Sequence, residues 1–194
     1  RDPELDMFRP ENGPPYSPEF LASYADAQVA RSRRIRDWVL GQLDADGAGS
    51  AAPDPSFVVH GTCADPRFLD LTIDPSDRET GTLWGDAWTA NAAPSSLGRY
   101  ASGRSWLSQW SITDSQGHGP THLPHVSVPV LVVYGTADQA AFPAHAQQLF
   151  DAVKHEDREL VALAGANHYF IDQPDHVATA VDTMVDWARR HDLA

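Results

Sequence analysis

An aspartate and a histidine stand in two separate loops that could bring them together as a catalytic pair. Asp138 ends the stretch VPVLVVYGTAD at residues 128–138, and His168 lies in GANHYF at residues 165–170. A carboxylate that accepts a hydrogen bond from one imidazole nitrogen fixes the tautomer of the ring, and the other nitrogen can then take a proton from a nucleophile. The two residues predict nucleophilic chemistry, and they raise the question of where the nucleophile lies.

Two strands and two helices are predicted to position this pair. Residues 128–134 form a continuous apolar run, typical of a parallel strand that is buried on both faces. A helix is expected from Pro143, a second strand over residues 158–165, and a last helix from about 174 to 190. This order predicts a right-handed parallel unit, and functional loops gather at the carboxyl ends of such strands.

The last helix is expected to bury one apolar face against this sheet, because its apolar residues recur at helical spacing. These residues are Val177, Val181, Met184, Val185 and Ala188.

The chain upstream of this unit is less regular. Residues 1–16 contain four prolines and predict an irregular arm, whereas residues 18–43 show helical periodicity behind the capping residue Ser17. A short strand is expected in SFVVHG at residues 56–61, and one or two short helices over residues 95–110. Apolar and polar residues also alternate between these segments, with the apolar positions at Leu69, Leu71 and Ile73.

We therefore predict an α/β fold in two parts. Residues 1–125 form an irregular arm and a mainly helical cap or insertion, and residues 126–194 form a strand–helix–strand–helix core.

The stretches VPVLVVYGTADQAAFPAHAQQLFDAV and ELVALAGANHYF resemble the C-terminal end of the α/β-hydrolase family, in particular its esterase-like bacterial members. The resemblance covers residues 126–191 strongly and the cap region more weakly. In that family the acid and the histidine follow the last two core strands, so Asp138 matches the acid and His168 the histidine. The resemblance implies a hydrolase of carboxylic esters that needs no organic cofactor and no metal, with a small apolar ester as substrate.

One part of the family pattern is missing. The nucleophile elbow G-x-S-x-G is absent, and so is the loop that supplies the oxyanion hole. The expectation is that the strands carrying the nucleophile are not in this chain but upstream of Arg1, in the same precursor or in a second chain. The start at Arg1 instead of methionine agrees with this expectation, under which the chain alone is inactive.

Two alternatives remain open. An upstream aspartate nucleophile would make the protein a haloalkane dehalogenase or an epoxide hydrolase, and a chain with no nucleophile would be a scaffold or binding module. Ser105 and Ser108 in SGRSWLS are weak candidates for a nucleophile, because no Gly follows at the elbow spacing and no strand is predicted before them.

Other chemistry-bearing residues are better explained by structure. Prolines and glycines in HGPTHLPH should prevent a helix from aligning His118, His122 and His125 on a metal. His60 and Cys63 are too close in sequence, without a helix, to orient a base toward a thiol. Aromatic residues are expected either to pack in a core or to line a substrate pocket: Trp84, Trp88, Trp106, Trp110 and Tyr169.

Composition and charge limit the classes of function that the protein can have. A net charge of −13 argues against nucleic-acid binding, and RSRRIR at residues 31–36 is expected to be a solvated or salt-bridged surface. The single cysteine, Cys63, excludes an internal disulfide, and the longest apolar run is too short to cross a bilayer. We expect a cytoplasmic protein that contacts no membrane.

Overall fold

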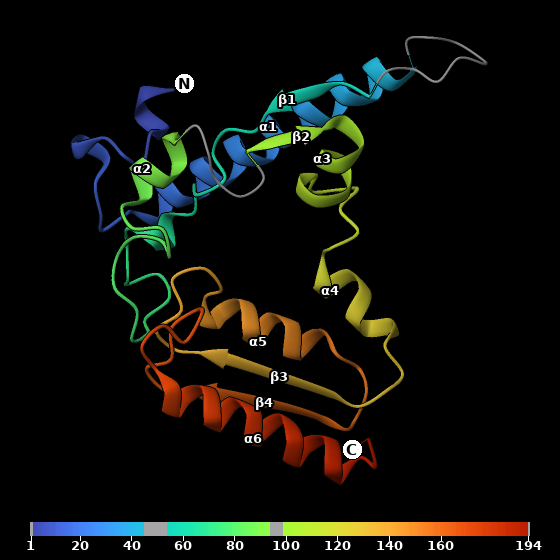
Figure 1. Ribbon diagram of the computed structural model, residues 1–194. Helices are drawn as coiled ribbons and strands as arrows, with labels where there is room; N and C mark the ends of the chain where they lie inside the picture. Colours follow the sequence, from blue (N-terminus) through green and yellow to red (C-terminus); the bar gives the residue numbers. More distant parts are fainter. Residues whose placement is uncertain (1, 45–53, 94–98, 194) are drawn as a thin grey trace. The chain divides into compact units, whose positions relative to one another are not determined.

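The computed structural model describes residues 2–44, 54–93 and 99–193 of the chain (Figure 1). These residues form helices of very different lengths and two small two-stranded sheets. None of the helices in the described ranges is both long enough and apolar enough to cross a membrane.

The chain divides into two compact units. Unit 1 comprises Arg1–Pro66 and Ala87–Gly117, and unit 2 comprises Arg67–Asp86 and His118–Ala194. Unit 2 thus contains two segments that the sequence-based division at residue 125 assigned to the cap. Segment 67–86 is the more important of them, because it contacts the loops that carry the candidate site.

Unit 1 is built on the long helix α1, Pro18–Asp44. The hydroxyl of Ser17 accepts a hydrogen bond from the backbone N–H of Phe20 at 3.1 Å, which caps the helix as the sequence predicts. The remaining elements are α2 (Ala87–Ala92), α3 (Gly103–Trp110), and two 3₁₀ turns at Pro3–Leu5 and Pro10–Asn12. Strands β1 (Ser56–Val58) and β2 (Tyr100–Ser102) pair antiparallel.

A small aromatic and aliphatic core joins α1, β1, β2 and α3. Its buried members are Val39, Val59, Ala101 and Trp106, against which Phe57 and Trp110 pack in part. Trp106 and Trp110 therefore pack in the core of unit 1, one of the two roles expected for them.

Unit 2 contains the predicted strand–helix–strand–helix order. Strand β3 (Val130–Gly135) and strand β4 (Arg158–Leu163) pair parallel, in a register that runs from Val130 with Arg158 to Gly135 with Leu163. Helices α5 (Pro143–Ala152) and α6 (Pro174–Arg190) lie on opposite sides of this strand pair in Figure 1. A short helix α4 (Gly119–His122) and 3₁₀ turns at Pro66–Phe68 and Leu123–His125 complete the unit.

Burial in unit 2 differs from the prediction. Residues Val130–Tyr134 of β3 are half-buried instead of buried on both faces, and β4 is the only strand paired with β3 in the described residues. On α6, Ala180 is the buried residue that packs on the sheet, together with Leu163 and Ala166. Three of the residues predicted to be buried form a neighbouring stripe that stays open: Val177 is 43% exposed, Val181 46% and Met184 48%.

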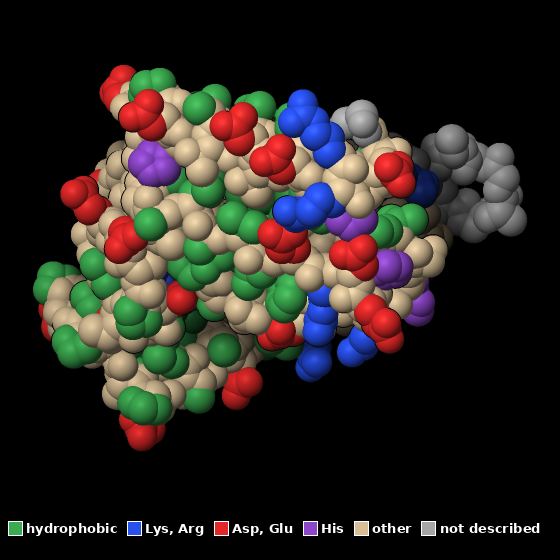
Figure 2. Space-filling model, turned by 90° about the horizontal axis from the view of Figure 1, so that it is seen from below, with side chains coloured by type: hydrophobic (Ala, Val, Ile, Leu, Met, Phe, Trp, Pro, Cys, Tyr) green, Lys and Arg blue, Asp and Glu red, His purple; other side chains and the backbone are tan. Residues whose placement is uncertain are grey.

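Figure 2 views the molecule from the side on which α6 lies in Figure 1, and hydrophobic side chains are visible there between charged ones. Helix α6 therefore has apolar residues beyond the face that packs on the sheet. No described residue covers this additional apolar stripe.

Residues Leu69, Leu71 and Ile73, where apolar and polar residues alternate, lie in turns, because Asp70 is buried and accepts hydrogen bonds from the N–H and hydroxyl of Thr72. Two local predictions are wrong. A short strand, β2, does precede Ser105. A helix does form over Gly119–His122, because Pro120 stands in its first turn, where a missing N–H costs nothing.

Candidate active site

The site lies where β3 and β4 end. Backbone pairing continues past the strands, since the N–H of Thr136 donates to the carbonyl of Leu163 and that of Ala137 to the carbonyl of Ala166, both at 3.1 Å. This close approach needs glycine at position 135. A Cβ built there would lie 2.2 Å from the carbonyl oxygen of Ala166, so only glycine lets the two loops meet.

Asp138 and His168 meet at this edge of the sheet. The Nδ1 atom of His168 lies 2.9 Å from Oδ2 and 3.1 Å from Oδ1 of Asp138. The carboxylate side chain is 10% exposed and the imidazole 31%, so the acid is sheltered and the ring reaches the surface. The structure thus brings together the two residues that the sequence singled out.

The carboxylate of Asp138 is held by the turn that follows it. Its Oδ1 atom accepts hydrogen bonds from the backbone N–H groups of Ala140 at 2.7 Å and Ala141 at 2.9 Å. This aspartate turn uses Oδ1 and leaves Oδ2 aimed at the imidazole. The chain then enters α5 through Phe142, which is only 1% exposed and anchors the turn.

The histidine loop is held by two amide side chains. Gln173 accepts a hydrogen bond from the N–H of Asn167 at 2.9 Å and donates one to the carbonyl of Gly165 at 2.7 Å. The side chain of Asn167 in turn bonds the backbone N–H and carbonyl of Ile171. These bonds compensate the backbone strain at Phe170, whose φ of +53° is uncommon for a non-glycine residue.

The geometry assigns the tautomer of His168. An ionised carboxylate has only acceptors, so Nδ1 carries the proton that the hydrogen bond requires, and Nε2 of the neutral ring has a free lone pair. Nε2 makes no hydrogen bond to any residue that the structure describes. The rings of Tyr169 and His168 meet in an edge-to-face arrangement, with centroids 4.5 Å apart, and Tyr169 is 63% exposed. Tyr169 therefore borders the site and is not a core residue.

Chemically, this arrangement is an oriented base, and no hydroxyl or thiol among the described residues of unit 2 bonds its Nε2 atom. Ser105 and Ser108 lie on α3 in unit 1, and the N–H of Ser105 donates to the capping hydroxyl of Ser102 at 3.3 Å. Strand β2, which precedes α3, pairs antiparallel and is three residues long. Neither serine stands on a turn that follows a parallel strand.

The histidine cluster and Cys63, the other candidates for chemistry, show no arrangement of a functional site in the described residues. The Nδ1 atom of His118 contacts the hydroxyl of Thr121 at 2.7 Å, and no group of three potential metal ligands occurs among the described residues. Cys63 is 2% exposed, and burial raises the pKa of its thiol, which disfavours the reactive thiolate.

Unit 1 has a cavity of its own, with a volume of about 280 Å³, next to α1 and the N-terminal arm. Its lining includes Tyr24 and Arg31 but none of the tryptophans. Burial raises the pKa of Tyr24 to about 12, so its hydroxyl stays protonated and donates to the carbonyl of Ala64 at 2.6 Å. Trp88 packs instead on Phe8, and Trp84 is half exposed in unit 2.

Sequence reasoning missed the residues that support the site. Asn167 and Gln173 carry a recognisable signal, because amide side chains in a loop often bond the local backbone. Asp77, which contacts the loops of both site residues, carries no such signal. Its partner Thr136 lies 59 positions away, so only the folded chain brings them together.

Comparisons with known proteins give one structural likeness. No family model and no curated protein matches the chain. The chain aligns with the crystal structure of the monoacylglycerol lipase of Paleococcus ferrophilus, with 22% sequence identity and a TM-score of 0.45. The likeness covers 91% of this chain and 54% of that chain, so this protein spans about half the length of the lipase.

Proposed function

We propose that this chain is the C-terminal part of a hydrolase of the α/β-hydrolase class that cleaves small apolar carboxylic esters. The observation that carries the proposal is the Asp138–His168 pair, with Nδ1 bonded to the carboxylate at 2.9 Å and Nε2 open. This is the orientation that the general base of a triad requires.

In the proposed reaction, a serine hydroxyl approaches Nε2 of His168. The base takes the hydroxyl proton as the oxygen attacks the ester carbonyl, and Asp138 stabilises the imidazolium that forms. The imidazolium then gives this proton to the leaving alcohol as the acyl–enzyme forms. Water, activated by the same nitrogen, hydrolyses the acyl–enzyme and releases the carboxylic acid. Backbone N–H groups of an oxyanion hole would stabilise the tetrahedral intermediates.

The serine and the oxyanion hole are proposed to lie on strands outside residues 1–194, either in the same precursor or in a second chain. Two features of unit 2 support this. The apolar strand β3 is half-buried and pairs on one edge only in the described residues. The α6 stripe of Val177, Val181 and Met184 is open, although its pattern is that of a packed face. A neighbouring strand and helix would cover both.

The test is the substitution Asp138→Asn in the complete protein. An amide cannot stabilise the imidazolium and favours the wrong tautomer, so turnover of a short p-nitrophenyl ester should fall roughly 10⁴-fold. The matched control is Asp151→Asn, which changes an exposed aspartate on α5 whose side chain bonds only Gln147 among the described residues. Near-normal turnover with Asp138→Asn would refute the assignment, as would an equal loss in the control.

The nature of the nucleophile is tested by covalent labelling. A fluorophosphonate should label a serine of the complete protein. If labelling fails and the protein releases halide from haloalkanes or forms diols from epoxides, the nucleophile is an aspartate. If the complete protein does none of these, the chain is a binding module that has kept the scaffold.

A further inference from the structure

Segment 67–86 of unit 2 contacts the loops of both site residues. Its central contact is Asp77, whose Oδ2 atom accepts a hydrogen bond from the hydroxyl of Thr136. The backbone N–H of Asp77 also donates to the carbonyl of Thr136 at 3.1 Å. Asp77 is therefore bound through both its side chain and its backbone to the residue that follows β3.

The same carboxylate reaches the loop after β4. The N–H of Gly165 donates to the Thr136 hydroxyl oxygen at 2.8 Å and lies 3.2 Å from Oδ2 of Asp77. Three groups from three separate segments thus share one small hydrogen-bond cluster. The Thr136 hydroxyl is its centre, because it donates to Asp77 and accepts from Gly165.

This cluster lies at the base of both loops. Thr136 stands two residues before Asp138, and Gly165 stands three residues before His168. The backbone at Gly165 has a φ of +74°, so the direction in which the loop leaves β4 is set at this residue. A shift of one loop against the other at this point would lengthen the Asp138–His168 hydrogen bond.

Segment 67–86 is itself anchored to the acid loop and α5. Buried Arg78 lies over the ring of Phe142, with its guanidinium carbon 4.9 Å from the ring centroid. Asp74 accepts a hydrogen bond from the N–H of Ala144 at 3.1 Å, and Gln139 donates to the carbonyl of Glu79 at 3.3 Å. Asp77 is thus held on both sides along its own segment.

We propose that Asp77 is a positioning residue that sets the distance between Asp138 and His168 through Thr136 and Gly165. The inference rests on the proposed function for its catalytic meaning, but not for its geometry. Asp77 does not touch the imidazole. It acts by fixing the two loops whose separation decides whether the acid and the base remain bonded.

The first test uses the complete protein and needs no ester substrate. A proton on Nδ1 of His168 that is bonded to Asp138 should give a far-downfield proton NMR resonance, assigned by its loss in His168→Gln. Asp77→Ala and Thr136→Val should abolish or broaden this resonance in a folded chain. Asp77→Asn and Thr136→Ser should keep it, because each retains an oxygen that can bond its partners.

The matched control is Asp74→Ala. This change removes a charge from the same segment and a hydrogen bond to α5, but it leaves the cluster of Asp77, Thr136 and Gly165 intact. The resonance should persist in it. Thermal unfolding followed by circular dichroism shows which variants are folded.

Three results would overturn the inference. An unchanged resonance in folded Asp77→Ala and Thr136→Val would show that the loops do not depend on the cluster. Unfolding of both variants would show that the cluster stabilises unit 2 as a whole and has no specific role in positioning the pair. Absence of the resonance from the unaltered protein would show that Asp138 and His168 do not form the hydrogen bond that Asp77 is proposed to maintain.

The second test separates this inference from the proposed function. In the complete enzyme, Asp77→Ala should lower kcat for the ester by about 10²-fold and leave KM unchanged, since misplaced catalytic groups lose rate and not binding. If the complete protein hydrolyses no ester while the resonance responds as stated, the positioning role stands and the hydrolase assignment fails. A rise in KM at constant kcat would contradict the positioning role.

Discussion

At the scale of single residues, glycine controls how closely the two loops of the site approach. Because Gly135 has no Cβ, the carbonyl oxygen of Ala166 can approach its backbone closely. A Cβ at this position would lie 2.2 Å from that oxygen. The two hydrogen bonds that extend the pairing beyond β3 and β4 depend on this approach. Asp138 and His168 can bond only because their loops leave the sheet this close together.

We therefore expect Gly135→Ala to destabilise unit 2 by at least about 2 kcal/mol. The added methyl group would clash with a backbone carbonyl, which cannot move away by a change of rotamer. The midpoint of thermal unfolding, followed by circular dichroism at matched protein concentration, measures the effect. Gly41→Ala is the matched control, because a Cβ at this exposed position of α1 meets nothing within 4 Å. The same added methyl should there stabilise the helix by about 0.5–1 kcal/mol. Equal effects of the two changes would disprove the steric argument.

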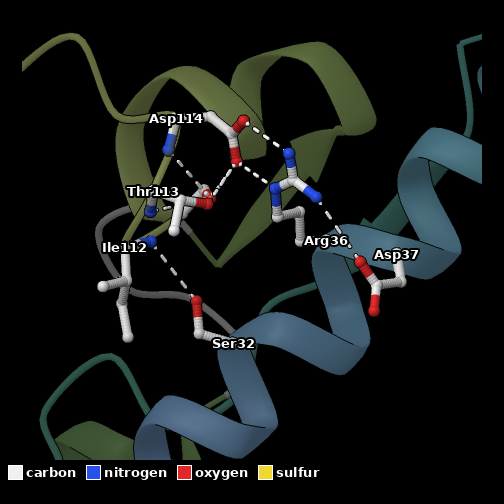
Figure 3. A network of polar contacts seen from close by, with 7 residues as sticks. Ser32, Arg36, Asp37, Ile112, Thr113 and Asp114 are labelled. Atoms are coloured by element: carbon white, nitrogen blue, oxygen red, sulfur yellow. Dashed lines mark hydrogen bonds and ion pairs between the residues drawn. The ribbon is translucent and has the colours of Figure 1, made fainter.

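At the scale of elements, the long helix α1 is tied to the turn after α3 by an ion pair. Figure 3 shows Arg36 of α1 facing Asp114, with its Nε 2.6 Å from Oδ2 and its second terminal nitrogen 3.1 Å from Oδ1. The hydroxyls of Ser111 and Thr113 also donate to Oδ2 of Asp114. Arg36, one arginine of the RSRRIR stretch, is thus salt-bridged, which is one of the two roles predicted for this stretch.

The network should make the stability of unit 1 depend on pH. The hydrogen bonds from Arg36 and then Ser111 lower the pKa of Asp114 from 3.8 to about 2. A lowered folded-state pKa stabilises the fold above the unfolded value, and this stabilisation is lost as the pH falls from about 4 toward 2. Asp114→Asn should therefore lower stability by about 1 kcal/mol at neutral pH, a value reduced for partial exposure.

The measurement is urea unfolding of both proteins at several pH values. The difference between them should shrink toward zero as the pH approaches 2. The control is Asp37→Asn, because Asp37 meets Arg36 at 3.5 Å on the open side of the helix, where screening by water makes the pair weak. A difference that is constant from neutral pH to pH 2 would refute the assignment to Asp114.

At the scale of the whole molecule, unit 2 has a small parallel sheet with apolar surface in the open. Strand β3 has one paired edge in the described residues, and α6 leaves Val177, Val181 and Met184 exposed. Exposed strand edges and apolar stripes favour association with another chain.

We expect residues 1–194 expressed alone to associate or aggregate and to show no esterase activity above background. Sedimentation at several concentrations and a p-nitrophenyl ester assay measure the two properties. Adding a segment that bears the proposed nucleophile strand, covalently or in trans, should restore both solubility and turnover. The double change Val181→Lys and Met184→Glu should reduce association, whereas Val185→Ile, beside the stripe, should not. A soluble monomer whose turnover is abolished by Ser105→Ala would overturn the proposal.

The sequence by itself determined the elements whose signals are local. Helical periodicity behind Ser17 predicted α1 to within one residue of its observed end at Asp44. The β-branched run and the proline at position 143 placed β3 and the start of α5 nearly where they are. The strand-end positions of Asp138 and His168 were sufficient to single them out as a pair, because parallel strands end at the same edge of a sheet.

Only the tertiary structure decided which distant residues support that pair and which apolar faces are covered. Asp77 reaches Thr136 and Gly165 across 59 and 88 positions of sequence. Apolar and polar residues alternate around Leu71, yet the chain turns there at buried Asp70. Likewise, the periodicity of α6 shows that a face is apolar but not whether a neighbour covers it. Burial depends on contacts between segments far apart in the chain, and local sequence patterns do not encode those contacts.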